Sequence, residues 1–232
     1  MRFKRLIQQI GNDNMNRLRQ STVLVVGLGG VGGNAAEAIA RSGFGRIVLV
    51  DRDVFDITNI NRQLGALDST MQTRKVDVIK QRIKDINPAC EVIAHHLFYD
   101  DETKAMIWAE PIDYVIDCID TITYKLDLVR ETQTRGIPAI HVMGTGNKLC
   151  PERLRIMSLA STTHDPIARV MRQKLRDACN LKQIAVIASD EPPLTLDPPT
   201  NVPSSNPFVP NAAGILAASY IFRKAINEAP PL

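Results

Sequence analysis

The chain has 232 residues, 44% of them hydrophobic, which is enough to bury one substantial core. Its net charge of +3 permits a nucleic-acid partner without requiring one. The four cysteines never form a Cys-x-x-Cys pair, so a zinc knuckle is not expected, and we find neither a signal peptide nor a membrane span. We therefore expect a cytoplasmic protein.

The first half of the chain alternates between strands and helices. Residues 1–20 predict a polar helical lead-in that Gly11 interrupts. The predicted strands are 22–26, 46–50, 91–96, 112–117 and 138–143, and the predicted helices are 31–42, 73–86 and 121–135. This alternation predicts an α/β fold, a doubly wound, Rossmann-like and mostly parallel sheet.

Beyond Gly144 the pattern is looser. It indicates strands at 153–159 and 183–188, a basic helix at 166–178 and an apolar helix at 212–227. The segment from Glu191 to Pro210 holds seven prolines, and we interpret it as a lid over the crevice. We expect one domain over 1–232, in which 1–145 form the nucleotide-binding core and 146–232 complete the sheet and the substrate side.

A glycine-rich turn joins strand 22–26 to helix 31–42. Its glycines are Gly27, Gly29, Gly30 and Gly32. This order lets bare backbone N–H groups and a helix N-terminus face a phosphate, and Asp51, at the end of the next strand, can accept from ribose hydroxyls. The sequence thus predicts a nucleotide site; the alternative is a turn that only permits close packing of helix on sheet.

The connection after strand 46–50 is longer than the one a nicotinamide dehydrogenase normally has. It concentrates polar side chains: Asp53, Asn59, Asn61, Arg62 and Gln63. Lys75 opens the next helix. Such groups beside a phosphate loop suit a triphosphate whose charge must be neutralised during attack at phosphorus. For Arg62 and Lys75 taken singly, a solvated and well-capped loop is the alternative.

Two aspartates follow the fourth strand. Ligands of open α/β sheets bind past the carboxyl ends of the strands, so Asp120 is expected to face the glycine turn and to hold Mg²⁺. An N-cap role on helix 121–135 is compatible with this. Asp117 is expected to hydrogen-bond a neighbouring turn. We interpret the histidines of the strands as structural: His95, His96 and His141.

Together these motifs resemble the ThiF/MoeB and ubiquitin-activating superfamily over residues 1 to about 145. The resemblance rests on Gly-x-Gly-Gly-x-Gly, Asp-x-Asp, Thr58-Asn-Ile-Asn-Arg-Gln63, Lys75 and Asp-x-x-Asp. Members adenylate a carboxylate with ATP. The resemblance implies that Gly29 and Gly30 approach the phosphates and that Asp51 holds the ribose.

For the reacting groups, the resemblance implies that Asn59, Arg62 and Lys75 grip the phosphates and that Asp120 binds Mg²⁺. We assign Asp53 and Gln63 to the same site, and Arg62, Lys75 and Asp120 as the catalytic residues. Arg5 matches an N-terminal arginine that, in this superfamily, reaches into the partner subunit's ATP site. A homodimer with shared sites is implied; the alternative for Arg5 is a frayed basic terminus.

Nearly the whole chain resembles the branch that acts on threonylcarbamoyladenosine in tRNA. The resemblance is carried by Ala38–Gly43, Asn87-Pro88, Gly144-Thr-Gly146, Asp165–Arg172, Ser189-Asp-Glu191 and Phe208–Gly214. It implies ATP-dependent dehydration through an acyl-adenylate, with a sulfur-relay protein as a further partner to consider. Because Asn147–Pro151 departs from the pattern of that branch, we expect no ion-binding role for the 146–151 loop.

Three alternative functions remain open on the sequence. The first is an adenylyltransferase for the Gly-Gly carboxylate of a ubiquitin-like sulfur carrier, the second a nucleotide-holding scaffold without turnover, and the third an NAD dehydrogenase. For tRNA, two basic clusters offer salt-dependent phosphate contacts, or are merely solvated faces. They are Arg169, Arg172, Lys174, Arg176 and Lys182 in the C-terminal half, and Arg2, Lys4, Arg17 and Arg19 at the start.

Overall fold

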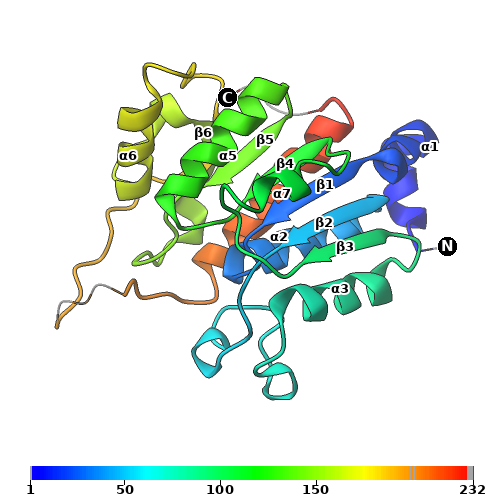
Figure 1. Cartoon of the computed structure of the whole chain (residues 1–232), viewed down its shortest axis with the longest axis horizontal. Helices are drawn as coiled ribbons and strands as arrows, with labels where there is room; N and C mark the ends of the chain where they lie inside the picture. The colour runs from blue at the N-terminus through cyan, green and yellow to red at the C-terminus, as the bar shows by residue number, and fades with distance from the viewer. Residues whose placement is uncertain (1, 199, 201, 229–231) are drawn as a thin grey trace.

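A seven-stranded sheet forms the centre of the computed structural model, which describes residues 2–198, 200, 202–228 and 232 (Figure 1). The strand order is β3-β2-β1-β4-β5-β7-β6, with β6 antiparallel to β7 and the other pairs parallel. The strands are β1 (Thr22–Val26), β2 (Arg46–Val50), β3 (Glu91–His95), β4 (Tyr114–Asp117), β5 (Ala139–Val142), β6 (Leu154–Ser158) and β7 (Ala185–Ser189). The predicted Rossmann-like α/β fold is confirmed, and the C-terminal strands belong to the same sheet.

Helices cover both faces of the sheet, as expected for strands that are apolar on both sides. One face packs against α1 (Lys4–Gln20), α2 (Gly30–Arg41), α3 (Lys75–Ile86) and α7 (Val209–Ala225). The other packs against α4 (Lys104–Ile107), α5 (Ile122–Arg135) and α6 (Pro166–Leu175). Short 3₁₀ turns occur at η1 (Ile57–Asn59), η2 (Asp68–Thr70), η3 (Pro151–Arg153) and η4 (Leu159–Ser161). All five residues of β1 are buried, because the strand lies between these two layers.

Several element boundaries differ from the prediction for local reasons. The lead-in helix agrees with its prediction, because it ends at Gln20 and Gly11, at φ 80°, kinks it. Helix 73–86 begins at Lys75, because Arg74 forms an isolated β-bridge with Val54. Helix 166–178 ends at Leu175, and helix 212–227 begins at Val209, since proline is tolerated in the first turn of a helix. The short α4 was not predicted.

α7 approaches α2 closely enough to require a glycine. A Cβ on Gly214 would lie 2.2 Å from the carbonyl oxygen of Val31, so only glycine fits at this crossing. The contact fixes the start of α7 beside the start of α2, where a Cβ on Gly30 would lie 3.3 Å from Pro210 Cβ. The C-terminal helix therefore helps to form the wall of the crevice at the glycine turn.

The strand order reverses between β1 and β4, which makes the carboxyl ends of these two strands a topological switch point. In open α/β sheets this is where ligands bind. The loop of residues 51–72, drawn in cyan at the lower left in Figure 1, extends from this end of the sheet. Among the described residues, no helix reaches the length and apolarity that crossing a bilayer requires.

Candidate nucleotide site

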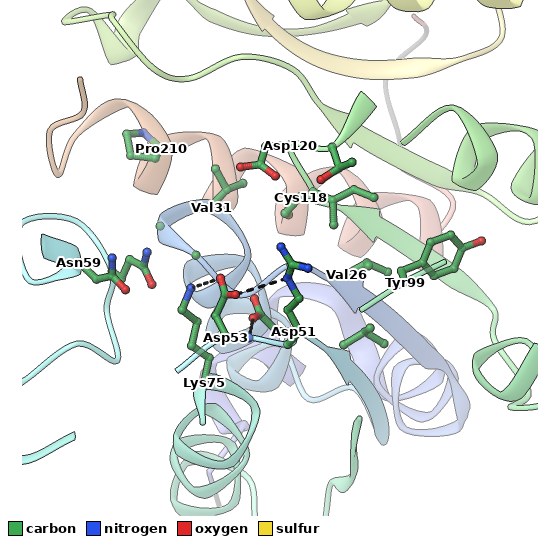
Figure 2. Close-up of a pocket in the computed structure, with 18 of the residues that line it drawn as sticks. Val26, Val31, Asp51, Asp53, Asn59, Lys75, Tyr99, Cys118, Asp120 and Pro210 are labelled. Atoms are coloured by element: carbon green, nitrogen blue, oxygen red, sulfur yellow. Dashed lines mark hydrogen bonds and ion pairs between the residues drawn. The ribbon is translucent and has the colours of Figure 1, made fainter. Parts of the chain in front are cut away.

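A cavity of about 600 Å³ lies past the carboxyl ends of β1, β2 and β4. It is lined by ten of the residues that the sequence predicts for the site: Gly27, Gly29, Gly30, Asp51, Asp53, Asn59, Arg62, Gln63, Lys75 and Asp120. Figure 2 shows Asp120 across the cavity from Lys75 and Asp53, with Asn59 at one side. Gly32 and Arg5 are not among the lining residues.

The glycines of the turn serve two different purposes. Gly27 has φ 86°, and a Cβ on Gly32 would overlap the Gly27 carbonyl oxygen, so the fold itself requires both. Gly32 therefore permits close packing of α2 rather than contact with a ligand. A Cβ on Gly29 would meet nothing closer than Gln63 Nε2 at 3.8 Å, so packing does not explain this glycine. Gly29 is also the N-cap of α2, where backbone N–H groups have no intrahelical acceptor and suit an anion.

Asp51 ties the glycine turn to the loop after β2. One carboxylate oxygen accepts from Leu28 N at 2.6 Å and the other from Asp53 N at 2.7 Å. Burial raises the pKa of Asp51 above its ordinary value, against the opposing effect of the Lys75 ammonium and the two N–H donors. The carboxylate thus builds the rim of the cavity, and its remaining lone pairs are free for a ribose hydroxyl.

Lys75 is buried at the start of α3 and donates to Asp53 Oδ2 at 3.0 Å, as the dashed line in Figure 2 marks. The Asp53 side chain is 55% exposed, whereas that of Lys75 is 6% exposed. The backbone N–H of Lys75 also donates to Asp53 O at 3.0 Å. The ammonium is therefore held at one wall of the cavity, and the alternative of a freely solvated lysine is wrong.

The Asn-Ile-Asn-Arg-Gln run folds as one compact turn. Asn59 Oδ1 accepts from Asp56 N at 3.2 Å in a capping box, and Asn59 lines the cavity from this turn. Arg62 is half-buried and donates to Thr58 O at 2.9 Å. Gln63 is buried, and its Oε1 has no hydrogen-bond partner within the described residues. The loop thus delivers a guanidinium and two amides to one side of the cavity.

Asp120 and Asp117 differ in their surroundings, and the N-cap alternative for Asp120 is wrong. α5 begins at Ile122 and its N-cap is Thr121. Asp120 is exposed and has no ion-pair partner among the described residues. Asp117 Oδ1 accepts from Ile119 N at 3.1 Å, which confirms its bond to a neighbouring turn. It also bonds Lys125 and His141, contacts that the sequence did not indicate.

Burial acts on Asp117 as well, but charged neighbours outweigh it. Desolvation alone would raise the pKa of this carboxyl, whereas the Lys125 ammonium and the hydrogen bond from His141 hold it below its ordinary value. Asp117 is therefore an anion at neutral pH.

The far side of the cavity is apolar, and sequence reasoning missed it. Leu97, Phe98 and Tyr99 follow β3 and line the cavity, with Arg52 placed 4.3 Å over the Phe98 ring. A flat nucleobase fits such a wall of ring and guanidinium planes. The carboxyl end of β3 was the available signal, because parallel strands end at one edge of the sheet.

The proline-rich segment passes beside the cavity, and its described residues up to Phe208 form neither helix nor strand, whereas Val209 and Pro210 begin α7. Ser205 lines the cavity, as does Pro210. Asn61 Nδ2 donates to Ser205 O at 3.0 Å, and Asn147 Oδ1 accepts from Ser204 N at 2.7 Å. The segment is therefore attached both to the Arg62 loop and to the 146–151 loop.

The side chains of the cavity suit a metal ion that is held in part by the phosphates of a bound nucleotide. Within the described part of the chain, no three His, Cys, Asp or Glu side chains are grouped to hold a metal ion. A single free carboxylate at Asp120, opposite a phosphate-binding turn, fits Mg²⁺, which typically binds one or two carboxylates plus substrate phosphates.

The fold and the cavity together define an α/β protein of the nucleotide-binding type, whose cavity combines a glycine turn, cationic groups beside it and an apolar wall. More specifically, the chain belongs to the ThiF family, whose model matches residues 3–228.

Named proteins and solved structures that are similar to this chain support this assignment. The tRNA threonylcarbamoyladenosine dehydratase of Bacillus subtilis is 47% identical over 97% of this chain and 95% of its own length. The Escherichia coli dehydratase is 35% identical over 75% of this chain, and the matched region covers only 65% of the E. coli protein. Solved structures of the E. coli dehydratase in complex with AMP and with ATP have TM-scores of 0.91 and 0.90, at 30% identity, covering 98% of this chain and 94% of theirs. The molybdopterin-synthase adenylyltransferase of Haemophilus influenzae is 30% identical over 60% of this chain and 58% of its own length.

Proposed function

We propose that this protein is an ATP-dependent enzyme that dehydrates threonylcarbamoyladenosine in tRNA to its cyclic form. The observation that carries the proposal is the cavity itself, in which Lys75, Arg62 and Asp120 surround the glycine turn. A protein that only stored nucleotide would not need these charges around the phosphates. End-to-end similarity to the Bacillus dehydratase supports the choice of substrate over a sulfur-carrier protein.

The reaction begins at the phosphate end of the cavity. The carboxylate of the threonylcarbamoyl group attacks the α-phosphorus of ATP, the bond to the β-phosphate breaks, and pyrophosphate leaves. Lys75 and Arg62 stabilise the charge that develops on the phosphate oxygens. The α2 N-terminus and Gly29 hold the phosphates in line. Asp120 would hold Mg²⁺, which supplies further charge neutralisation.

Ring closure then needs no protein nucleophile. The ureido nitrogen or oxygen of the same modification attacks the activated carbonyl carbon, a ring forms, and AMP leaves. Because this nucleophile belongs to the same molecule, its effective molarity replaces a catalytic Cys or Ser. Burial raises the pKa of Cys118, the cysteine that lines the cavity, which keeps its thiol protonated and unreactive.

For tRNA docking we favour α6 over the N-terminal cluster. The α6 N-cap, Asp165, lies against Gly144, where a Cβ would be 3.2 Å from Asp165 Oδ2, and the next residue, Thr145, lines the cavity. Arg169 and Lys174 are exposed on this helix. α1 instead precedes β1 and so starts from the opposite end of the sheet. From the proposed tRNA substrate we infer that the protein acts in the cytoplasm.

Arg5 is exposed on α1 and does not line the cavity of its own chain. We therefore propose that the protein is a homodimer and that Arg5 reaches into the ATP site of the partner subunit. Mixing inactive Lys75→Met and Arg5→Ala chains tests this, because shared sites would restore activity in the mixed dimer. A sulfur-relay protein is a further candidate partner, and pull-down with the persulfide-carrying protein would reveal it.

Mass spectrometry of nucleosides tests the function directly. Transfer RNA bearing threonylcarbamoyladenosine is incubated with the protein and Mg·ATP, with an ATP-free reaction as control. Loss of one water from the nucleoside, with stoichiometric AMP, is the expected result. An unchanged nucleoside with bound but unused ATP would contradict the proposal and favour a carrier-protein substrate, which ATP–pyrophosphate exchange with that protein would detect.

A further inference from the structure

Three titratable side chains are buried behind the nucleotide cavity without lining it. Asp117 ends β4, His141 is in β5 and Lys125 is in the first half of α5; the first and last are 0% exposed and His141 is 1% exposed. Lys125 Nζ donates to Asp117 Oδ1 at 2.8 Å, and His141 Nδ1 is 2.9 Å from Asp117 Oδ2. We call these three residues the buried cluster.

Stability alone does not account for the buried cluster. Removing a carboxylate and an ammonium from water costs several kcal/mol per ion, and apolar replacements of similar volume are often as stable or more so. The neighbouring surfaces of β4 and α5 are apolar, with Val115 and Leu128 both fully buried, so an apolar contact could have filled this space. The cluster therefore has to be explained by what it orients.

What it orients is the loop of residues 118–121, which lines the cavity throughout. At one end, Cys118 N donates to Val26 O at 2.9 Å, and Ile119 N donates to the same Asp117 oxygen that Lys125 contacts. At the other end, Lys125 N donates to Thr121 O at 3.0 Å. The Lys125–Asp117 ion pair thus joins the two ends of the loop that carries Asp120.

We propose that Asp117, Lys125 and His141 are positioning residues that hold the 118–121 loop in one conformation, so that Asp120 faces the glycine turn. His141 occupies the second oxygen of Asp117, which leaves the first for Lys125 and Ile119. The three side chains act through the loop and touch no substrate. This inference rests on the proposed function, in which Asp120 serves the adenylation step.

The first test removes the ion pair without leaving a buried charge. Asp117→Asn combined with Lys125→Met keeps volume and net charge close to those of the wild type. We expect a folded protein whose KM for ATP changes less than about twofold, while kcat falls on the order of 10- to 100-fold, because a misplaced catalytic group mainly costs turnover. Amide hydrogen exchange of the peptide that contains 118–121 should become faster by about tenfold, with the exchange of β1 unchanged.

A matched control removes an ion pair elsewhere. Arg46 contacts Glu110 at 2.6 Å near the amino end of β2, away from the cavity. Arg46→Met is expected to lower the melting temperature without changing kcat. A double variant that keeps wild-type kcat, or slower exchange of 118–121 than in the wild type, would overturn the proposal. The proposal would also be overturned if Arg46→Met lowered kcat as much as the double variant does at equal destabilisation.

A milder pair of variants covers the case in which the double variant does not fold. His141→Asn keeps an N–H donor near the position of Nδ1, whereas His141→Leu leaves Asp117 Oδ2 without one. The proposal expects kcat to fall in His141→Leu and to be largely retained in His141→Asn, and equal kcat in the two would overturn it. Hydrogen exchange needs no substrate, so it separates failure of this inference from failure of the proposed function, which would instead show as an inactive wild type.

Discussion

Lys75 and Asp53 form an ion pair whose two members differ in exposure: the ammonium is buried at the start of α3, and the carboxylate faces the cavity. The pair joins the start of the loop after β2 to the next helix, on the side of the cavity where the phosphates are expected. A triphosphate that enters the cavity competes with Asp53 for the lysine. We therefore expect Asp53 to hold the ammonium in place until nucleotide binds.

Lys75→Met is expected to reduce kcat/KM on the order of 100- to 1,000-fold, the usual cost of losing one charged donor at a developing oxyanion. The methionine keeps the apolar stem in its buried position, so the fold should remain. The measurement is AMP formation with modified tRNA. Lys80→Met, on the exposed part of the same helix, serves as control and should leave the rate unchanged. Full activity in Lys75→Met would exclude the lysine from the reaction.

Asp120→Ala is expected to abolish turnover while leaving the melting temperature within about 2 °C of the wild type, since substitutions at exposed, unpaired positions rarely exceed about 0.5 kcal/mol. Asp120 makes no ion pair among the described residues, so the fold loses nothing when it is removed. The variant should also no longer respond to Mg²⁺ titration at fixed ATP. If activity persists, Asp120 does not belong to the site.

A substitution at Arg52 tests whether the apolar wall of the cavity binds the base. Its guanidinium lies over Phe98, and this pair is expected to form the platform for the base. Arg52→Ala should weaken ATP binding about two- to fivefold, in line with roughly 0.5–1 kcal/mol for an exposed cation–π contact, and should leave kcat nearly unchanged. Isothermal titration with a non-hydrolysable ATP analogue measures the affinity. Unaltered affinity in both Arg52→Ala and Phe98→Ala would place the base elsewhere.

The sequence predicted the phosphate side of this cavity better than its base side. Glycine spacing, Asp51 and the Asn-Arg-Gln run are local patterns whose geometry follows from strand, turn and helix, so Gly29, Arg62 and Lys75 were found where expected. Phe98 and Ser205 come from connections whose paths depend on the whole fold, and nothing in their local sequence indicates a ligand. Only the rule that parallel strands end at one edge could have found Phe98.

The buried cluster illustrates the same limit. Asp117, Lys125 and His141 lie on three elements, and only the parallel register of β4 and β5, which places Asp117 opposite His141, brings two of them together. The prediction that His141 is structural agrees with its burial, but it did not include the contact with Asp117. Gly32 shows the opposite limit, because a glycine that the motif assigned to the nucleotide-binding turn is required by packing and does not line the cavity.

Glu191 links the 146–151 loop to the proline-rich segment, and its contribution to stability should depend on pH. Its carboxylate accepts from Leu149 N at 2.8 Å and from Cys150 N at 3.0 Å. Burial alone would raise the pKa of Glu191, but these two donors and Arg153 hold it below its ordinary value.

A carboxyl whose pKa is lower in the folded state stabilises the fold fully above its unfolded pKa, about 4.3, and loses that effect as the pH falls through the folded value. Glu191→Gln, which keeps an acceptor, should therefore cost about 1 kcal/mol at pH 7, and the difference from the wild type should shrink toward zero below about pH 4. Urea unfolding at both pH values measures it. A difference that stays constant or grows on acidification would show that the ionised carboxylate does not hold the loop.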